Sequence, residues 1–241
     1  DLLGFSGPVD NTYDAIQHND HALECFSVLS ILDSFLSRWA QDLYFYMTPE
    51  VGMMEIPDRY CGTSALMAQK KNPMLVEFLQ GASSLPIGHM VTAFLVEKTP
   101  SGGAIAERRF FINGLWTSFE ATFRFLYWMD LILPDCQWNI ERMRELSGMH
   151  WAQASDLGGI LVKEKGLAWR TAHAIAGTVV RLSLERSIRP RDVTTSLVDE
   201  AAELYIGQPL CLSPDLLASV LDPEACVDRH NIFGGPASSQ M

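Results

Sequence analysis

One uninterrupted helical pattern constrains the fold of this chain more than any other feature. From Tyr13 to Met47 the sequence contains neither proline nor glycine, the residues that most often end a helix. Apolar side chains recur there at the three- to four-residue spacing that places them on one helix face: Leu23, Phe26, Leu29, Leu32, Phe35, Leu36, Trp39 and Leu43. Val28, Ile31 and Tyr46 widen this stripe, which predicts a long helix packed on several sides inside a bundle.

The rest of the chain is also predicted to be helical. Asn72 is a favoured N-cap and Pro73 suits the first helical position, so a second helix should begin there, with a kink at Pro86. The TPSGG stretch (99–103) separates this helix from a third one. Seven further helices are expected: 73–96, 104–133, 140–147, 154–165, 168–186, 194–205 and 214–221. No β-alternating run is long enough for a sheet, so the predicted fold class is all-α.

The domain boundary is expected at Pro134 and Asp135, because the segments beyond them are shorter and more polar. A chain of 241 residues is long enough for two modest domains. We therefore expect a helical-bundle domain over 1–135 and a small helical domain over 136–241. The chain opens at Asp1 without an initiator methionine, which suggests a piece of a longer protein.

Charge and cysteine usage exclude several classes of partner. The formal net charge of -11 would repel a phosphate backbone, which makes nucleic acid an unfavourable partner. The five cysteines are widely spaced and form no C-x-x-C pair, so neither a disulfide framework nor a zinc site is expected. Glu120, Arg124 and Asp130 interrupt the most apolar stretch, which predicts a core helix and no membrane span. A cytoplasmic protein without metal or cofactor is expected.

The stretch 61–73, CGTSALMAQKKNP, carries the residues best suited to chemistry. Removing a proton from the carbon next to a carboxylate develops negative charge, which cations, backbone N–H groups or a helix N-terminus can stabilise. Lys70, Asn72 and the amides that follow offer these groups, and Ser64 offers a hydroxyl as the base. The same residues also fit a solvated surface loop that ends in an ordinary helix cap, and the spacing by itself favours that interpretation.

The stretch resembles the Gly-Ser-Ser-x-Met-Pro-x-Lys-x-Asn-Pro loop of the fumarase/aspartase superfamily, and its QKKNP ending is typical of argininosuccinate lyases. Four other segments resemble the same family in the same order. They are NTYDAIQHND, TPEVGMMEIPDRY, GLAWRTAHAIAGTVVRL and VLDPEACVDRHNIFGGPA. The resemblance is to the C-terminal portion of these lyases and covers nearly the whole chain. It implies a long-helix bundle of the fumarase/aspartase type with a small C-terminal helical domain.

The resemblance also implies an activity and the residues that carry it. The activity is β-elimination of fumarate from an N-substituted aspartate, or the reverse addition. Ser64 is the expected base, Glu77 the expected partner of a catalytic histidine, and the substrate is expected to contact Thr63, Gln69, Lys70 and Asn72. That histidine belongs to an N-terminal half that this chain does not contain, and the active sites are shared between subunits of a homotetramer. The alternative is an inactive lyase-derived structural or regulatory subunit.

Several positions depart from the family pattern. Ala65 replaces a second serine, and Ala68 replaces a proline, which should make the loop more flexible. Residues 99–109, TPSGGAIAERR, stand where argininosuccinate lyases have a substrate-binding segment with a tyrosine and a glutamine. Residues 17–20, QHND, replace Ser-Asp-Arg-Asp, so a substrate-side arginine is also lost. We therefore expect a different amine partner, with fumarate retained on the other side.

Overall fold

The computed structural model describes residues 3–98 and 106–240. The chain forms two compact units, Asp1–Asn139 and Ile140–Met241. Each unit has an apolar core of its own. Helices dominate the described residues of both units, which confirms the all-α class. None of the described helices is both long enough and apolar enough to span a membrane.

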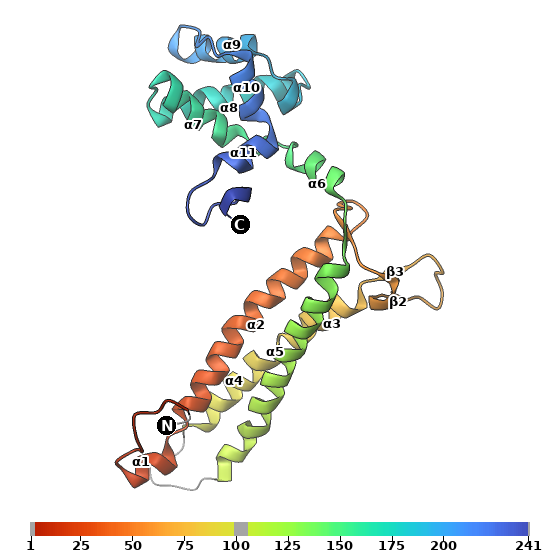
Figure 1. The fold of residues 1–241 in the computed structure, drawn as a ribbon, viewed down its shortest axis with the longest axis vertical. Helices are drawn as coiled ribbons and strands as arrows, with labels where there is room; N and C mark the ends of the chain where they lie inside the picture. Colours follow the sequence, from red (N-terminus) through yellow and green to blue (C-terminus); the bar gives the residue numbers. More distant parts are fainter. Residues whose placement is uncertain (1–2, 99–105, 241) are drawn as a thin grey trace. The chain divides into compact units, whose positions relative to one another are not determined.

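The first unit is built on three long helices that lie side by side (Figure 1). Its elements are α1 Thr12–Gln17, α2 Asp20–Tyr46, β1 Met54–Glu55, η1 Asp58–Tyr60, β2 Gly62–Thr63, β3 Lys71–Asn72, α3 Met74–Ala82, α4 Leu85–Val96, η2 Ala106–Arg108, α5 Arg109–Asp135 and β4 Gln137–Trp138. The long helices are α2, α4 and α5, and α3 packs against α2 and α5. The strands form two antiparallel pairs, β1 with β4 and β2 with β3.

Two apolar clusters stabilise this unit. The smaller joins α2, α4 and α5 near α1: Ala22, Phe26, Ala93 and Phe111. The larger lies at the opposite end of α2 and reaches the strands: Leu36, Ala40, Leu43, Met54, Ile56, Val76, Leu79, Phe125, Met129 and Ile132. Burying each large side chain stabilises the fold by about 1.5–3 kcal/mol. The larger cluster therefore provides a rigid support for the strands that follow it.

A buried polar pair lies on the facing sides of α2 and α5. Asp33 is 0% exposed, and its Oδ2 accepts a hydrogen bond of 2.5 Å from the hydroxyl of Thr122. Its other carboxylate oxygen, Oδ1, has no partner among the described residues. Burial raises the pKa of Asp33, because the charged form loses its hydration there.

The first expected helix, 13–47, is wrong in one respect, because the chain leaves the helix at His18 and Asn19. His18 has extended backbone angles, and Asn19 donates a hydrogen bond of 2.6 Å to Oε1 of Glu97 in the chain after α4. Arg108 of η2 binds backbone carbonyls at the end of α1. Contacts with distant segments therefore end α1 where the local sequence would allow a continuous helix.

The expected second helix, 73–96, is also two helices. The chain breaks at Ser83 and Ser84, and Pro86 lies in the first turn of α4, where a missing N–H costs little. Pro86 therefore begins a helix and does not kink one. Asn72 is not the N-cap of α3, because it lies in β3 and Pro73 precedes the first helical residue without a side-chain cap.

The third expected helix, 104–133, agrees with α5 over most of its length. Its expected start at Ala104 lies outside the described residues, and α5 itself runs from Arg109. The helix continues to Asp135, with Pro134 in its last turn. Residues 136–139 then stay with the first unit, because Trp138 pairs with Met54 and Gln137 pairs with Glu55.

The second unit is a compact group of helices that are each shorter than α2 and α5. They are α6 Ile140–Ser147, α7 Ala154–Lys165, α8 Trp169–Glu185, η3 Pro190–Asp192, α9 Thr195–Ile206, α10 Pro214–Leu221, α11 Pro223–Arg229 and η4 Ser238–Gln240. Helix α8 is central: Ala172, Ile175, Val179 and Leu182 are buried against neighbouring helices. The bounds of α6, α7 and α10 are those predicted, whereas α11 is an addition. Asp222 caps α11 and Pro223 begins it, which is an ordinary signal for a helix start.

Candidate active-site loop

The stretch 62–72 forms a short hairpin. Gly62 pairs with Asn72 and Thr63 pairs with Lys71 in an antiparallel register. The pairing ends at Thr63 and Lys71, so Ser64 and Lys70 are the first and last residues of the connecting loop. Directly opposite residues in antiparallel strands have Cα atoms about 4.5–5.5 Å apart, so this pairing brings the two ends of the loop together. The backbone therefore assembles residues that are separated in sequence.

Ser64 is half-buried at the start of this loop. Its Oγ accepts hydrogen bonds from the backbone N–H groups of Leu66, at 3.2 Å, and Met67, at 3.1 Å. Two amide donors directed at one hydroxyl oxygen favour negative charge on that oxygen. This is the local environment that a serine needs in order to act as a base.

The two neighbouring lysines have different surroundings. Lys71 Nζ lies 2.6 Å from Oε1 of Glu55 and 2.8 Å from Oδ1 of Asp58. These carboxylates, Asp58 more than Glu55, hold the pKa of Lys71 above its ordinary value. Lys70 is exposed, and within the described part of the chain its ammonium group makes no hydrogen bond or ion pair. The adjacent lysines are therefore suited to different tasks, Lys71 to holding the hairpin and Lys70 to binding an anion.

The base of the hairpin packs closely on the chain around it. A Cβ added at Gly62 would lie 3.1 Å from Sδ and 3.3 Å from Cβ of Met74, so only glycine fits there without a shift. The hydroxyl of Tyr60 donates a hydrogen bond of 2.7 Å to Asp135 at the end of α5, and Arg59 pairs with the same carboxylate. The hairpin is thus fixed at its base, whereas residues 65–70 at its tip are exposed.

The remaining candidate residues surround this hairpin. Thr63 and Gln69 are exposed, and Asn72 is half-buried in β3. Glu77 lies in the first turn of α3, exposed, and its N–H donates to the carbonyl of Pro73. The structure therefore places the six candidates on the hairpin and the start of α3, and their chemical roles stay predictions. Sequence reasoning missed Glu55 and Asp58, which bind Lys71, and Tyr60 and Asp135, which bind each other, because these pairings depend on how the chain folds back on itself.

The described parts of the two divergent segments, residues 17–20 and 106–109, lie at the opposite end of the first unit from the hairpin (Figure 1). Arg108 is 7% exposed and binds the carbonyls of Ile16 and Gln17, which ties residues 106–108 to α1. Residues 99–105 lie outside the described part of the chain. Helix α2 has 27 residues, which corresponds to a length of about 40 Å. This helix separates α1 from the hairpin, so within one chain the described parts of the divergent segments are far from Ser64 (Figure 1).

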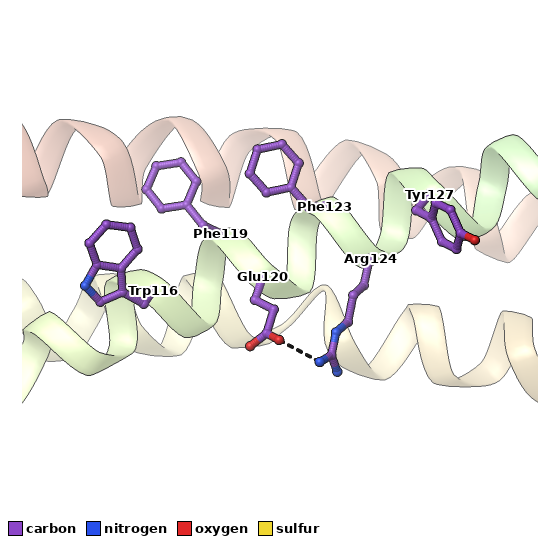
Figure 2. Close-up of a pocket in the computed structure, with 6 residues that line it drawn as sticks. All are labelled: Trp116, Phe119, Glu120, Phe123, Arg124 and Tyr127. Atoms are coloured by element: carbon purple, nitrogen blue, oxygen red, sulfur yellow. Dashed lines mark hydrogen bonds and ion pairs between the residues drawn. The ribbon is translucent and has the colours of Figure 1, made fainter.

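A shallow apolar pocket of about 690 Å³ lies on the outer face of α5. Figure 2 shows the side chains that line it: Trp116, Phe119, Glu120, Phe123, Arg124 and Tyr127. The Glu120 and Arg124 side chains form an ion pair of 2.6 Å, and Phe119 and Phe123 stack at 6.3 Å between ring centroids. The carboxylate of the lining, Glu120, is engaged by Arg124, and four of the six lining side chains are aromatic. This surface is therefore suited to packing and not to catalysis.

Comparison with known proteins agrees with this arrangement. A family model described as "Lyase" matches residues 1–88, and one described as "Argininosuccinate lyase C-terminal" matches residues 151–228. Argininosuccinate lyase from Methanothermobacter thermautotrophicus is 34% identical over 240 residues, which are 100% of this chain and 51% of the relative. Argininosuccinate lyase from Methanocaldococcus jannaschii is 32% identical over 241 residues, with 100% and 48% covered. The chain thus spans about half the length of these relatives.

Solved structures give the same result. A variant of EDDS lyase with bound fumarate superposes with a TM-score of 0.84 at 30% identity, covering 99% of this chain and 48% of that chain. The class II fumarase from Schistosoma mansoni, at 16% identity and a TM-score of 0.61, shares the fold. These solved structures share the helix arrangement of this chain. Together with the sequence relatives, they show that this chain belongs to the fumarase/aspartase superfamily as an argininosuccinate lyase-like member.

Proposed function

We propose that the intact protein is a carbon-nitrogen lyase that releases fumarate from an N-substituted aspartate, or catalyses the reverse addition. The observation that carries this proposal is the position of Ser64. Its hydroxyl oxygen accepts hydrogen bonds from two backbone amides, and Ser64 directly follows the paired residue Thr63, as Lys70 directly precedes its partner Lys71. The names of the relatives, argininosuccinate lyase and EDDS lyase with bound fumarate, support the same reaction class.

In the proposed reaction Ser64 removes a proton from the carbon beside a substrate carboxylate. The electron pair of that C–H bond first enters the carboxylate, which becomes doubly charged. Lys70 and the amide group of Asn72 stabilise this charge, helped by the exposed N–H groups at the start of α3. The pair then forms the C=C bond of fumarate while the neighbouring C–N bond breaks. The departing amine keeps the electrons of that bond and takes a proton from a general acid.

The general acid comes from outside these residues. Glu77 lies in the first turn of α3, where it is available to orient a histidine. We assign that histidine to a part of the protein beyond this chain, which spans about half the length of its relatives. The exposed tip of the loop, residues 65–70, is free to close over the substrate and exclude water. The chain by itself should therefore be inactive.

The active site of the proposed enzyme is assembled from several subunits of a homotetramer. Residues 17–20, which should contact the amine, lie at the N-terminal end of α2, a helix about 40 Å long whose other end leads toward the hairpin. One small substrate does not reach both from a single chain. The long helices also expose large apolar side chains along their lengths, which suits packing against other copies: Val28, Ile31, Phe35, Trp116, Phe123 and Tyr127.

Fumarate release tests the proposal. The intact protein should form fumarate, followed by its ultraviolet absorbance, from at least one N-substituted aspartate in a panel of different amines. Ser64→Ala should lower kcat by at least about 100-fold. Ser147→Ala is the matched control, because that exposed serine lies in the second unit and bonds only within its own helix. Turnover that survives Ser64→Ala would show that the assigned base is wrong.

A second function is a lyase-derived subunit without activity. The observation that favours it is Asn19, which stands where the family resemblance expects a substrate-side arginine and is instead bonded to Glu97. Calorimetry of the intact protein with fumarate separates the two functions. An inactive subunit should bind no fumarate, whereas the proposed enzyme should bind it and lose that binding in Lys70→Met.

A further inference from the structure

Lys71 has no role in the reaction proposed above, yet its ammonium group makes two ion pairs at the hairpin. Its ammonium group bridges Glu55 of β1 and Asp58 of η1, at 2.6 and 2.8 Å. Its backbone pairs with Thr63, the residue before the proposed base. One side chain therefore connects the loop strand to the segment on which the loop is built.

The segment that holds Lys71 is itself anchored. Glu55 pairs with Gln137 across the β1–β4 ladder. Asp58 is the first residue of η1. The other two residues of η1, Arg59 and Tyr60, both bind Asp135 at the end of α5. A continuous set of contacts thus runs from α5 through β1 and η1 to Lys71. The tip of the loop has no comparable contact in the described residues.

From this geometry we infer that Lys71 is a positioning residue for the elimination. By clamping β3 to Glu55 and Asp58, it keeps Thr63 opposite Lys71 and so holds Ser64 and Lys70, the residues next to that pair. The inference rests on the proposed function, because it names the residue through which Ser64 and Lys70 are held. Lys71 does not touch the substrate. Of the two neighbouring lysines, Lys70 binds the anion and Lys71 holds the loop in place.

The position of the lysine pair explains this division. Lys71 belongs to β3, whereas Lys70 is the last residue of the loop that precedes it. Lys71 turns to the carboxylates beneath the hairpin, where its side chain is 33% exposed, whereas Lys70 is exposed at the loop end. Neither lysine can therefore take over the position of the other unless the strand moves.

Two measurements on the intact protein test this inference. Hydrogen exchange followed by mass spectrometry reports how tightly residues 62–72 are held, independently of activity. Lys71→Met should speed exchange there by about 10-fold and leave α2 and α5 unchanged. Fumarate release should show kcat lowered by about 10- to 100-fold with a smaller change in KM, because the reacting groups are misplaced. Lys71→Arg should restore most of both properties, since a guanidinium can pair with both carboxylates.

Lys70→Met is the matched control. It should abolish turnover while leaving exchange at residues 62–72 within about two-fold of the parent protein. The double variant Glu55→Gln with Asp58→Asn removes the clamp from the other side, and both side chains are largely exposed, so it should fold and reproduce Lys71→Met. The two clamp variants remove the same ion pairs from opposite sides. If one of them fails to fold, the other still tests the inference.

The outcomes are distinct. If Lys71→Met changes neither hydrogen exchange nor kcat, the positioning role is refuted. If the variant raises KM alone, the positioning role is also refuted, and Lys71 instead binds the substrate directly. If exchange rises in both clamp variants but kcat stays at the parent value, the clamp does not place the base, and the inference is again refuted. Failure of the proposed function itself appears separately, as turnover that survives Ser64→Ala.

Discussion

Gly62 and Asn72 are paired across the first rung of the β2–β3 ladder, so the hairpin closes on a residue without a side chain. Asn72 leads directly into Pro73 and α3, and Met74 of that helix fills the space beside Gly62. The candidate base and the helix start are therefore held together by one close approach of the backbone. Five measurements follow from this and other contacts.

Gly62→Ala should destabilise the protein by about 1 kcal/mol, because its Cβ would approach Met74 and force that side chain to move. The end of the Met74 side chain is flexible and can yield to one methyl group. Gly62→Val adds a larger side chain and should therefore cost more, about 2–3 kcal/mol. Gly81→Ala in α3 is the control: nothing lies within 4 Å of its Cβ, so it should stabilise by about 0.5–1 kcal/mol. Urea unfolding measures each change, and equal effects at the two glycines would contradict the packing argument.

Asp33→Asn should stabilise the protein at neutral pH by about 1 kcal/mol. Burial raises the pKa of Asp33 above its ordinary value of 3.8, so the folded protein binds this proton more tightly than the unfolded chain. The resulting stability is fully present below the ordinary pKa and is lost as pH rises through the raised folded value. The urea midpoint of the parent protein should fall as pH rises, and in Asp33→Asn this fall should disappear. The control variant Asp42→Asn, at an exposed position on the same helix, should keep it.

Tyr60→Phe should make the hairpin base more sensitive to acid. Hydrogen bonds from Tyr60 and Arg59 hold the pKa of Asp135 below its ordinary value of 3.8. The stability that this carboxylate contributes is present above the ordinary pKa and is lost as pH falls through the lowered folded value. Without the tyrosine hydroxyl, loss should begin at higher pH, seen as faster hydrogen exchange in 54–62. An unchanged acid profile would mean that Asp135 does not anchor η1.

Gly207→Ala should destabilise the second unit by about 1 kcal/mol. Gly207 ends α9 with φ +75°, a left-handed conformation that a side chain disfavours. Gly177→Ala, in the middle of α8 with open space around its Cβ, should instead stabilise by about 0.5–1 kcal/mol. The Tm values of the two variants should therefore shift in opposite directions. Shifts in the same direction would show that the effect does not arise from the backbone conformation at Gly207.

Phe123→Asp should dissociate the proposed homotetramer. Phe123 is 65% exposed in the apolar pocket of α5, and a carboxylate buried at a subunit contact would have no partner there. Light scattering should show a lower mass and the fumarate assay a parallel loss of turnover. Leu204→Asp, at a residue 64% exposed in the second unit, is the control that should leave the mass unchanged. A tetramer that tolerates Phe123→Asp would place the contact elsewhere.

The sequence by itself determined most of the helices, because helical spacing and capping are local properties. The bounds of α6, α7 and α10 were predicted from local sequence, and the structure adds that Ser213 caps α10. The candidate residues Ser64, Lys70 and Asn72 were also chosen from the sequence, through the resemblance of their loop to a family motif. Their catalytic roles remain predictions.

Only the tertiary structure decided where long helical patterns break and what the second lysine does. Asn19 ends one pattern by bonding Glu97, 78 residues away, and Lys71 finds its carboxylates on a different strand and turn. Asn72, a good N-cap by local rules, pairs in a strand because Gly62 lies opposite it. Local rules describe the energies of neighbouring residues alone. Contacts between distant segments gain enough free energy to override them, and the sequence pattern does not reveal which distant segments meet.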